Sequence, residues 1–360
     1  MYRTNKIIAT LVASFMIGSI GWMPCSEAAS CTEIAQISVN QKGSNFKYWQ
    51  KGSAVLAQLR DYVQKVTNPK DKDFIPVRDR IAVFDVDGTL VCETAPFCFD
   101  FLMMVDRALY DSSYTASARD AQNAKDVEMD IYAHKVTNDT RIKTCESHAS
   151  VFAGMTPEEY ETYIEKYMQK SVEGFQNLKI GEAYYLPMVE VLSYLRANDF
   201  KIFLVSGADR QYTRVMVEIL PVDSDNIIGT DYRYVEENQQ GKDGMEYVFP
   251  SDGKVVRGEF EVKNINMNKV SAMAKEIGKH PVLAFGNSSG DFSMYNYTTA
   301  NTKYKTMVFS LLADDTEREF GKPVSAEKML KNCEKNGWIP ISMRDDWRTI
   351  YGDNVKKTGE

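Results

Sequence analysis

The sequence predicts an α/β protein built on a doubly wound parallel sheet. Apolar runs such as 81–84 and 201–205 carry almost no polar side chains, which is typical of strands covered on both faces. Each run ends in a polar loop that contains glycine, and segments with helical periodicity separate the runs. Strands that alternate with helices in this way form a parallel sheet with helices on both faces.

The first predicted elements are a leading helix and the first core strand. Apolar residues repeat on one stripe within 40–72, and Asn68-Pro69 ends the periodicity, so this stretch is predicted to be helical. The stripe consists of Val55, Leu56, Leu59, Val63 and Val66. The first core strand follows at 81–84.

A long segment after the first strand predicts a helical insertion. Residues 95–181 are rich in Tyr, Met, Ala and Glu, with helical periodicity at 101–110 and 157–175. We therefore expect a mainly helical cap at 95–181 and a core divided into 29–94 and 182–360.

The next predicted elements return to the core. A helix is expected at 187–197, a strand at 201–205 and a helix at 209–220. Short alternating pieces with Asp-Gly and Gly-Lys turns predict a β-hairpin insertion near 230–262, with the clearest pattern at 247–256.

The last predicted elements complete the sheet. A helix at 269–277 precedes a strand at 281–285, and a further strand is expected at 306–312. Residues 316–360 contain several large aromatic side chains and are expected to be ordered, without a chemical role.

Composition excludes several classes of function. The 360 residues are 44% hydrophobic and 26% charged, which indicates a globular chain with a sizeable core. The net charge of −7, without a basic stripe, argues against nucleic-acid binding. Three histidines and no Cys-x-x-Cys pair argue against a zinc site.

The amino terminus resembles a signal peptide over residues 1–28. Arg3 and Lys6 precede an apolar stretch, and small residues follow up to a cleavage point between Ala28 and Ala29. The alternative is a retained anchor, but the apolar stretch is short for a membrane span. We therefore expect an exported protein, periplasmic or extracellular, without a stable membrane span in its mature form.

Cleavage there would leave an odd number of cysteines, namely Cys31, Cys92, Cys98, Cys145 and Cys333. Disulfides are permitted in an exported protein, and Cys92 could pair with Cys98, or either of them with Cys145. The minority alternative is that Cys31 is the lipidated first residue of a lipoprotein.

Two carboxylates directly follow the first core strand. Asp85 and Asp87 are two residues apart, so both can point the same way while the chain stays extended, before Gly88 lets it turn. In open α/β sheets, ligands bind at the carboxyl edge of the strands. Two acids at that edge suggest a cation or a proton transfer, although an ordinary strand and turn is the alternative.

Further polar side chains follow the other predicted strands. Ser206-Gly207 ends one strand, Asn287 and Asp291 follow another, and Lys269 opens a helix that leads to the same edge. Because the carboxyl ends of parallel strands share one edge, we expect these side chains to converge.

Each of these residues also has a simpler interpretation. Ser206-Gly207 could be only a turn, and Lys269 could be a solvated helix residue. Lys263 is a rival for the cation of the site, and Arg210 could be either a phosphate ligand or a surface charge.

Together the motifs resemble the haloacid dehalogenase-like (HAD) phosphatase superfamily over about 78–315. The run Phe84-Asp-Val-Asp-Gly-Thr-Leu90 is similar to its first motif and Ser206-Gly207 to its second. Lys269 is similar to the third motif and Gly286-Asn-Ser-Ser-Gly-Asp291 to the fourth. The position of the helical cap, after the first motif, resembles the phosphoserine and phosphocholine phosphatase branch.

The resemblance implies an exported, Mg²⁺-dependent phosphatase that hydrolyses a small phosphomonoester. Asp85 would be the nucleophile that forms an aspartyl phosphate, and Asp87 the general acid and base. Lys269 would offset negative charge in a site poor in water. The partner would be a small-molecule phosphate ester.

The resemblance also implies residues that hold the substrate and the metal. Ser206 and Gly207 would hold phosphoryl oxygens, Thr89 would brace the turn, and Glu93 would contact substrate unless it is a surface acid. The implied Mg²⁺ ligands are Asp85, Asp87 through its carbonyl, Asn287 and Asp291. Many relatives have aspartate at the position of Asn287, so the division of ligand roles between Asn287 and Asp291 stays open.

Other functions remain compatible with these residues. A phosphotransferase would use the same aspartyl phosphate and differ only in the acceptor. A low-turnover extracytoplasmic binding protein on a HAD fold is the alternative from another class, because fold does not determine function.

Overall fold

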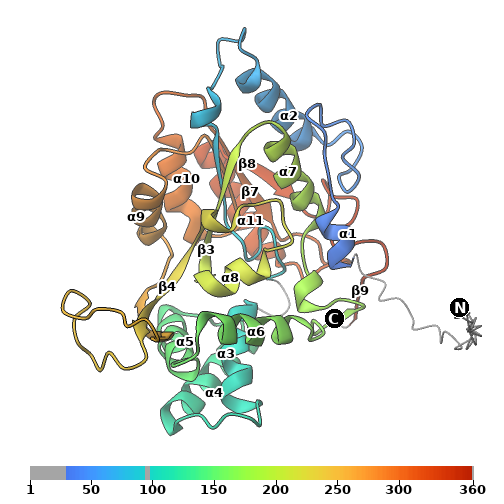
Figure 1. Cartoon of the computed structure of the whole chain (residues 1–360). Helices are drawn as coiled ribbons and strands as arrows, with labels where there is room; N and C mark the ends of the chain where they lie inside the picture. The colour runs from blue at the N-terminus through green and yellow to red at the C-terminus, as the bar shows by residue number, and fades with distance from the viewer. Residues whose placement is uncertain (1–29, 94–97, 359–360) are drawn as a thin grey trace, which may run out of the picture.

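The computed structural model describes residues 30–93 and 98–358, and within them it shows one large sheet (Figure 1). Its seven described strands lie in the order β5-β4-β3-β1-β6-β7-β8, and all neighbours are parallel except β4 and β5. The strands are β1 Ile81–Phe84, β3 Lys201–Asp209, β4 Ile227–Glu236, β5 Val255–Val262, β6 Leu283–Gly286, β7 Met307–Leu312 and β8 Ile339–Ser342. The predicted α/β fold with a largely parallel sheet is confirmed.

Side chains of the central strand alternate between two apolar cores. Ala82 and Phe84 of β1 pack in a cluster with α2 (Ala54–Thr67) and α7 (Leu186–Ala197). Ile81 and Val83 face the opposite side, because successive strand residues point to opposite faces. That side is covered by α9 (Met267–Glu276), α10 (Phe292–Thr299) and α11 (Pro323–Asn336).

Strand register places the ends of the central strands beside one another. Phe84, the last residue of β1, pairs with Leu204 of β3 and with Phe285 of β6. The residues that follow these positions therefore emerge at one edge of the sheet, where ligands bind in parallel α/β proteins.

The segment between β1 and β3 is mainly helical. It contains α3 Phe99–Leu109, α4 Ala118–Tyr132, α5 Asn138–Val151 and α6 Pro157–Met168. These helices gather at one end of the molecule, below the sheet in Figure 1. Ser117, Thr137 and Thr156 begin α4, α5 and α6, since each side chain accepts an amide of the first turn.

The amino-terminal helix is shorter than predicted. Residues 40–53 form turns, with Gly43 and Gly52 at positive φ, and α2 begins only after its cap Ser53. Its buried side includes Tyr62, whereas Val55 is partly exposed. A short helix, α1 (Cys31–Ala35), precedes these turns.

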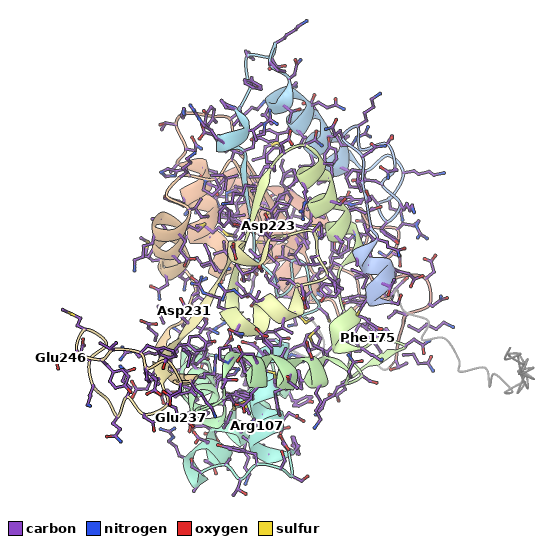
Figure 2. All side chains as sticks on the ribbon, in the orientation of Figure 1. Arg107, Phe175, Asp223, Asp231, Glu237 and Glu246 are labelled. Atoms are coloured by element: carbon purple, nitrogen blue, oxygen red, sulfur yellow. The ribbon has the colours of Figure 1, made fainter. Side chains whose placement is uncertain are left out.

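The antiparallel strands β4 and β5 lie within 227–262, but they are joined differently from the hairpin pattern at 247–256. Glu236 of β4 pairs with Val255 of β5, so residues 237–254 form a long connection. The pattern at 247–256 is therefore mostly loop, because exposed Val248 and Phe249 find no layer to pack against. Figure 2 labels Glu237 and Glu246 on this connection, which extends away from the rest of the molecule.

The end of the described chain adds elements that the sequence pattern did not specify. The helix α11 and the edge strand β8 both lie within 316–358, and β8 tolerates a proline because it is an edge strand. The short strands β2 (Phe175–Gln176) and β9 (Lys356–Lys357) pair with each other. The remaining elements are α8 Arg210–Met216, η1 Val77–Asp79, η2 Ile180–Glu182, η3 Ser224–Asn226 and η4 Ser289–Asp291.

Two expectations concern the termini and the cysteines. The signal peptide proposed for 1–28 lies outside the described residues. Across 30–93 and 98–358, none of the helices has the length and apolarity that crossing a membrane requires. The same residues contain no disulfide, so the pairings considered for Cys92, Cys98 and Cys145 are not formed in this structure.

Candidate active site

Asp85 is fixed where β1 ends. Its amide donates a hydrogen bond of 2.9 Å to the carbonyl of Phe285 in β6, which continues the sheet by one residue. Asp85 is 7% exposed and Asp87 is 8% exposed, so the sheet edge and the helical segment exclude most water from both. The first motif thus places two buried carboxylates at the carboxyl edge of the sheet.

Gly88 makes the turn after these carboxylates, as the sequence predicts. Its φ is +75°, and a Cβ at this position would lie 1.9 Å from Nδ2 of Asn287. Its amide donates to the carbonyl of Val91 at 2.7 Å, which closes the turn. Any larger residue would displace Asn287 and strain the backbone.

Lys269 of α9 reaches the carboxylates from the neighbouring face. Its Nζ donates to Oδ1 of Asp85 and to Oδ1 of Asp291, each at 2.7 Å. Burial tends to lower the pKa of Lys269, but the charges of Asp291 and Asp85 outweigh it and raise this pKa. Lys269 therefore stays charged between the two acids and lies within the cluster rather than in solvent.

Asp291 also organises the loop that follows β6. Its Oδ2 accepts the backbone amides of Asn287 and Ser288, both at 3.1 Å, and the Ser288 hydroxyl at 3.3 Å. One carboxylate oxygen thus holds the loop while the other holds Lys269. Asp291 is 1% exposed.

Asn287 turns away from this cluster. Its Nδ2 donates to Oε2 of Glu93 at 2.8 Å, and its Oδ1 accepts from the Thr89 hydroxyl at 3.4 Å. Thr89 is fully buried. Asn287 lines a neighbouring cavity of about 410 Å³, while Glu93 lines both this cavity and the one that contains Asp85.

Ser206 and Gly207 lie at the carboxyl half of β3. The Ser206 hydroxyl accepts the amide of Ala208 at 2.9 Å, and its carbonyl accepts from Nδ2 of Asn264 at 2.8 Å. The carbonyl of Gly207 accepts from the Thr230 hydroxyl at 2.6 Å. Gly207 lines the cavity, whereas Ser206 is fully buried behind it.

A cavity of about 320 Å³ joins the core to the helical segment. On the core side it is lined by Asp85, Asp87, Gly207, Lys269 and Asp291. On the helical side it is lined by Asp100, Phe101, Asn138 and Arg141, and Lys263 and Asn266 of the connection between β5 and α9 also line it. Motif reasoning missed Asp100, Asn138, Arg141 and Asn266, because a polar residue on a predicted helix or loop has no mark that distinguishes it from a solvated one.

The contacts of Arg210 and Lys263 distinguish these two candidate cations of the site. Arg210 forms paired hydrogen bonds with Asp231 and Glu276 on the core, at 2.6 to 2.8 Å, and does not line the cavity. Lys263 does line it, with Nζ lying 4.8 Å from the ring centre of Phe101. Lys269 is the residue that contacts Asp85.

The carboxylates of the cavity carry perturbed pKa values. Burial and the charge of Asp291 raise the pKa of Asp85 to about 7, against the opposing effect of Lys269. Burial, followed by the charges of Asp100 and Glu93, raises the pKa of Asp87 well above its usual range. Burial also raises the pKa of Asp100 to about 6. The site thus holds more carboxylates than a single lysine can neutralise, which favours a bound cation or a retained proton.

The donor set fits Mg²⁺ in chemical type. Asp85, Asp87 through its carbonyl, Asn287 and Asp291 would supply the carboxylate, carbonyl and carboxamide oxygens that this ion prefers. In the described parts of the chain, no three His, Cys, Asp or Glu side chains are grouped closely enough to form a ready metal site. Lys269 stands between Asp85 and Asp291, and the side chain of Asn287 is turned toward Glu93.

The sequence model of the haloacid dehalogenase-like hydrolases matches residues 82–295. The chain belongs to this family. The match runs from β1 to α10 and includes Asp85, Ser206, Lys269 and Asp291, which confirms the family resemblance found from the motifs. No curated protein matches the chain.

Solved structures similar to this HAD protein differ widely in sequence. A protein of unknown function from Bordetella pertussis Tohama I has 16% identity and a TM-score of 0.48, covering 73% of this chain and 97% of its own. A phosphoserine phosphohydrolase-like protein from Francisella tularensis has 17% identity and a TM-score of 0.39, covering 70% of this chain and 92% of its own. Cytosolic 5'-nucleotidase IIIB bound to cytidine has 12% identity and a TM-score of 0.48, covering 80% of this chain and 86% of its own. At these values the family assignment rests on the sequence match.

Proposed function

We propose that this HAD protein is a Mg²⁺-dependent phosphatase that hydrolyses a small phosphomonoester through an aspartyl phosphate. The observation that carries the proposal is the position of Asp85, a buried carboxylate at the carboxyl edge of β1 whose Oδ1 contacts Lys269 at 2.7 Å inside a cavity of about 320 Å³. The division into a core (29–94 and 182–360) and a cap (95–181) is part of the same proposal.

In the first step, a carboxylate oxygen of Asp85 attacks phosphorus, and the bond from phosphorus to the alcohol oxygen breaks. Asp87 donates its proton to that oxygen, a role that suits an acid whose pKa burial raises. In the second step, water attacks phosphorus, Asp87 takes its proton, and the bond to Asp85 breaks. Water is the only reactant that these steps need besides the ester.

The surrounding residues hold charge during these steps. Lys269 opposes the effect of burial on the pKa of Asp85 and orients its carboxylate, and Gly207 of β3, which lines the cavity, would face the phosphoryl group. A bound Mg²⁺, held by oxygens of Asp85, Asp87 and the loop that follows β6, would neutralise the charge of the phosphoryl oxygens.

The cavity supports a small, polar substrate. Asn138 and Arg141 of α5 line the same cavity as the carboxylates, together with Lys263 and Asn266 of the connection between β5 and α9. These side chains can hydrogen-bond the alcohol part of an ester, whereas the limited volume disfavours a large one.

The test is phosphate release by the purified chain from residue 29 onward. We expect Mg²⁺-dependent turnover of p-nitrophenyl phosphate and of some members of a panel of small phosphate esters, abolished by EDTA. Asp85→Asn should abolish turnover while the far-UV circular dichroism stays unchanged. Absence of turnover across the panel in the presence of Mg²⁺ would overturn the proposal, and transfer to added alcohols in place of water would identify a phosphotransferase.

We also propose export, on the basis of residues 1–28 alone. Expression of the full chain in a bacterial host and fractionation should recover a shortened protein outside the cytoplasm. Its amino-terminal sequence should begin at Ala29, and full-length protein retained in the cytoplasm would contradict this.

A further inference from the structure

Arg257 of β5 is a buried charge that the proposed chemistry does not use. It is 2% exposed, although arginine is among the residues that are least often buried. Its Nη2 donates to Oδ2 of Asp209 and to Nδ1 of His148, the latter at 3.1 Å. Its guanidinium also lies 3.9 Å from the ring centre of Tyr232 and 4.4 Å from that of Tyr160.

One of these partners belongs to the phosphate side of the cavity. Asp209 ends β3, two residues after Gly207, and its Oδ1 accepts the amide of Tyr212 at the start of α8. Its other oxygen, Oδ2, accepts from Arg257. The contact with Arg257 therefore fixes the end of the segment that carries Gly207.

A second partner of Arg257, His148, belongs to the α5 wall of the cavity. His148 lies on α5 about two helical turns after Arg141, which lines the cavity, so both residues lie on the same side of the helix. The backbone adds a second link, because the Arg257 amide donates to the carbonyl of Met155 at 2.8 Å. The amide of Gly154 in turn donates to the carbonyl of Arg257 at 2.9 Å. β5 thus pairs with the connection between α5 and α6.

We propose that Arg257 is a positioning residue that sets the distance between the phosphate side of the cavity and the α5 wall. The guanidinium donates from one nitrogen, Nη2, to both groups while its plane packs on two aromatic rings, and the compact ammonium of lysine does not reproduce this stacking. The inference rests on the proposed function for its kinetic consequences, and on the contacts above for its structural ones.

The kinetic test compares Arg257→Met and Arg257→Lys with the matched control Arg210→Met. Arg210 also pairs with two acids, Asp231 and Glu276, but these lie on the core. We expect Arg257→Met to raise KM about tenfold or more with kcat nearly unchanged, because misplaced walls weaken substrate binding while the reacting groups remain. Arg257→Lys should recover part of this loss, and Arg210→Met should keep KM within about twofold.

A merely structural role gives a different pattern, in which a smaller folded fraction lowers kcat and leaves KM unchanged. That pattern would overturn the inference. If Arg257→Met does not fold, the same comparison between Arg257→Lys and the control decides the question.

Hydrogen exchange provides a measurement that does not require activity. Backbone amides at 206–209 and in α5 should exchange faster in Arg257→Met than in the wild type, and those in α5 should be unchanged in Arg210→Met. If the wild type hydrolyses no phosphate ester, the proposed function fails and this measurement alone decides the inference. Unchanged exchange at 206–209 and in α5 in a folded Arg257 variant would contradict the positioning role of Arg257.

Discussion

Nδ2 of Asn287 donates to Oε2 of Glu93 at 2.8 Å, so a side-chain hydrogen bond joins the fourth motif to the chain just after the first motif. Because Glu93 is engaged by Asn287 and by the thiol of Cys98, it holds the loop that follows β6 as well as facing the cavity. The same bond directs the Asn287 side chain away from Asp85.

Replacing Asn287 should therefore destabilise the protein in the absence of metal. Asn287→Asp exchanges a donor for a second carboxylate opposite Glu93, which should reduce the free energy of unfolding by about 1–3 kcal/mol in EDTA. Urea unfolding measures this change. The double variant Asn287→Asp/Glu93→Gln restores a donor and an acceptor and should recover most of the loss, whereas two additive losses would show that the residues are not coupled.

The relation between Asn287 and Glu93 also shows where sequence reasoning reaches its limit. The strand ends were predictable, because apolar runs with polar ends identify buried parallel strands and their shared edge. The direction of the Asn287 side chain was not, because it depends on a partner 194 positions away along the chain. The role of Arg141 was not predictable for a similar reason, since it becomes a cavity residue only through the packing of α5 against the core.

The hairpin illustrates a different limit. Its strands have the expected alternation, but Asp252-Gly253 imitates a hairpin turn within a long connection. Turn chemistry is local, whereas the pairing of Glu236 with Val255 is determined by the register of the whole sheet.

Lys269 should matter far more for turnover than Lys263. Lys269→Met leaves Asp85 and Asp291 buried beside each other without their common cation, so kcat should fall by about 10²–10³-fold. Lys263→Met is the matched control, because Lys263 lines the same cavity without contacting Asp85, and it should change kcat by less than about tenfold. Steady-state kinetics on p-nitrophenyl phosphate measures both, and a larger effect at Lys263 would assign the cation of the site to that residue.

Asp79 should contribute to stability at neutral pH and lose that contribution in acid. Hydrogen bonds from Lys279 at 2.8 Å and from Tyr304 at 2.7 Å lower the pKa of Asp79 below its usual range. A lowered pKa means that the unfolded chain binds the proton first, so the stabilisation is complete above about pH 4 and disappears as the pH falls further. Urea unfolding of the wild type and Asp79→Asn should therefore show a difference in free energy that is largest at neutral pH and shrinks in acid. A difference that does not depend on pH would contradict this account.

His148 should make the protein sensitive to mild acid. Burial, and then the charge of Arg257, lower the pKa of His148 well below its usual range, so this ring stays neutral in the folded protein. Below about pH 6.5 the unfolded chain binds a proton that the folded chain does not. The free energy of unfolding should then fall with decreasing pH, by up to about 1.4 kcal/mol per pH unit from this residue.

His148→Gln keeps a polar side chain at this position without a titrating group, and its stability should depend less on pH between about 6.5 and 5. Equal slopes for the two proteins, measured by urea unfolding across this range, would show that His148 takes up its proton without opposition from Arg257.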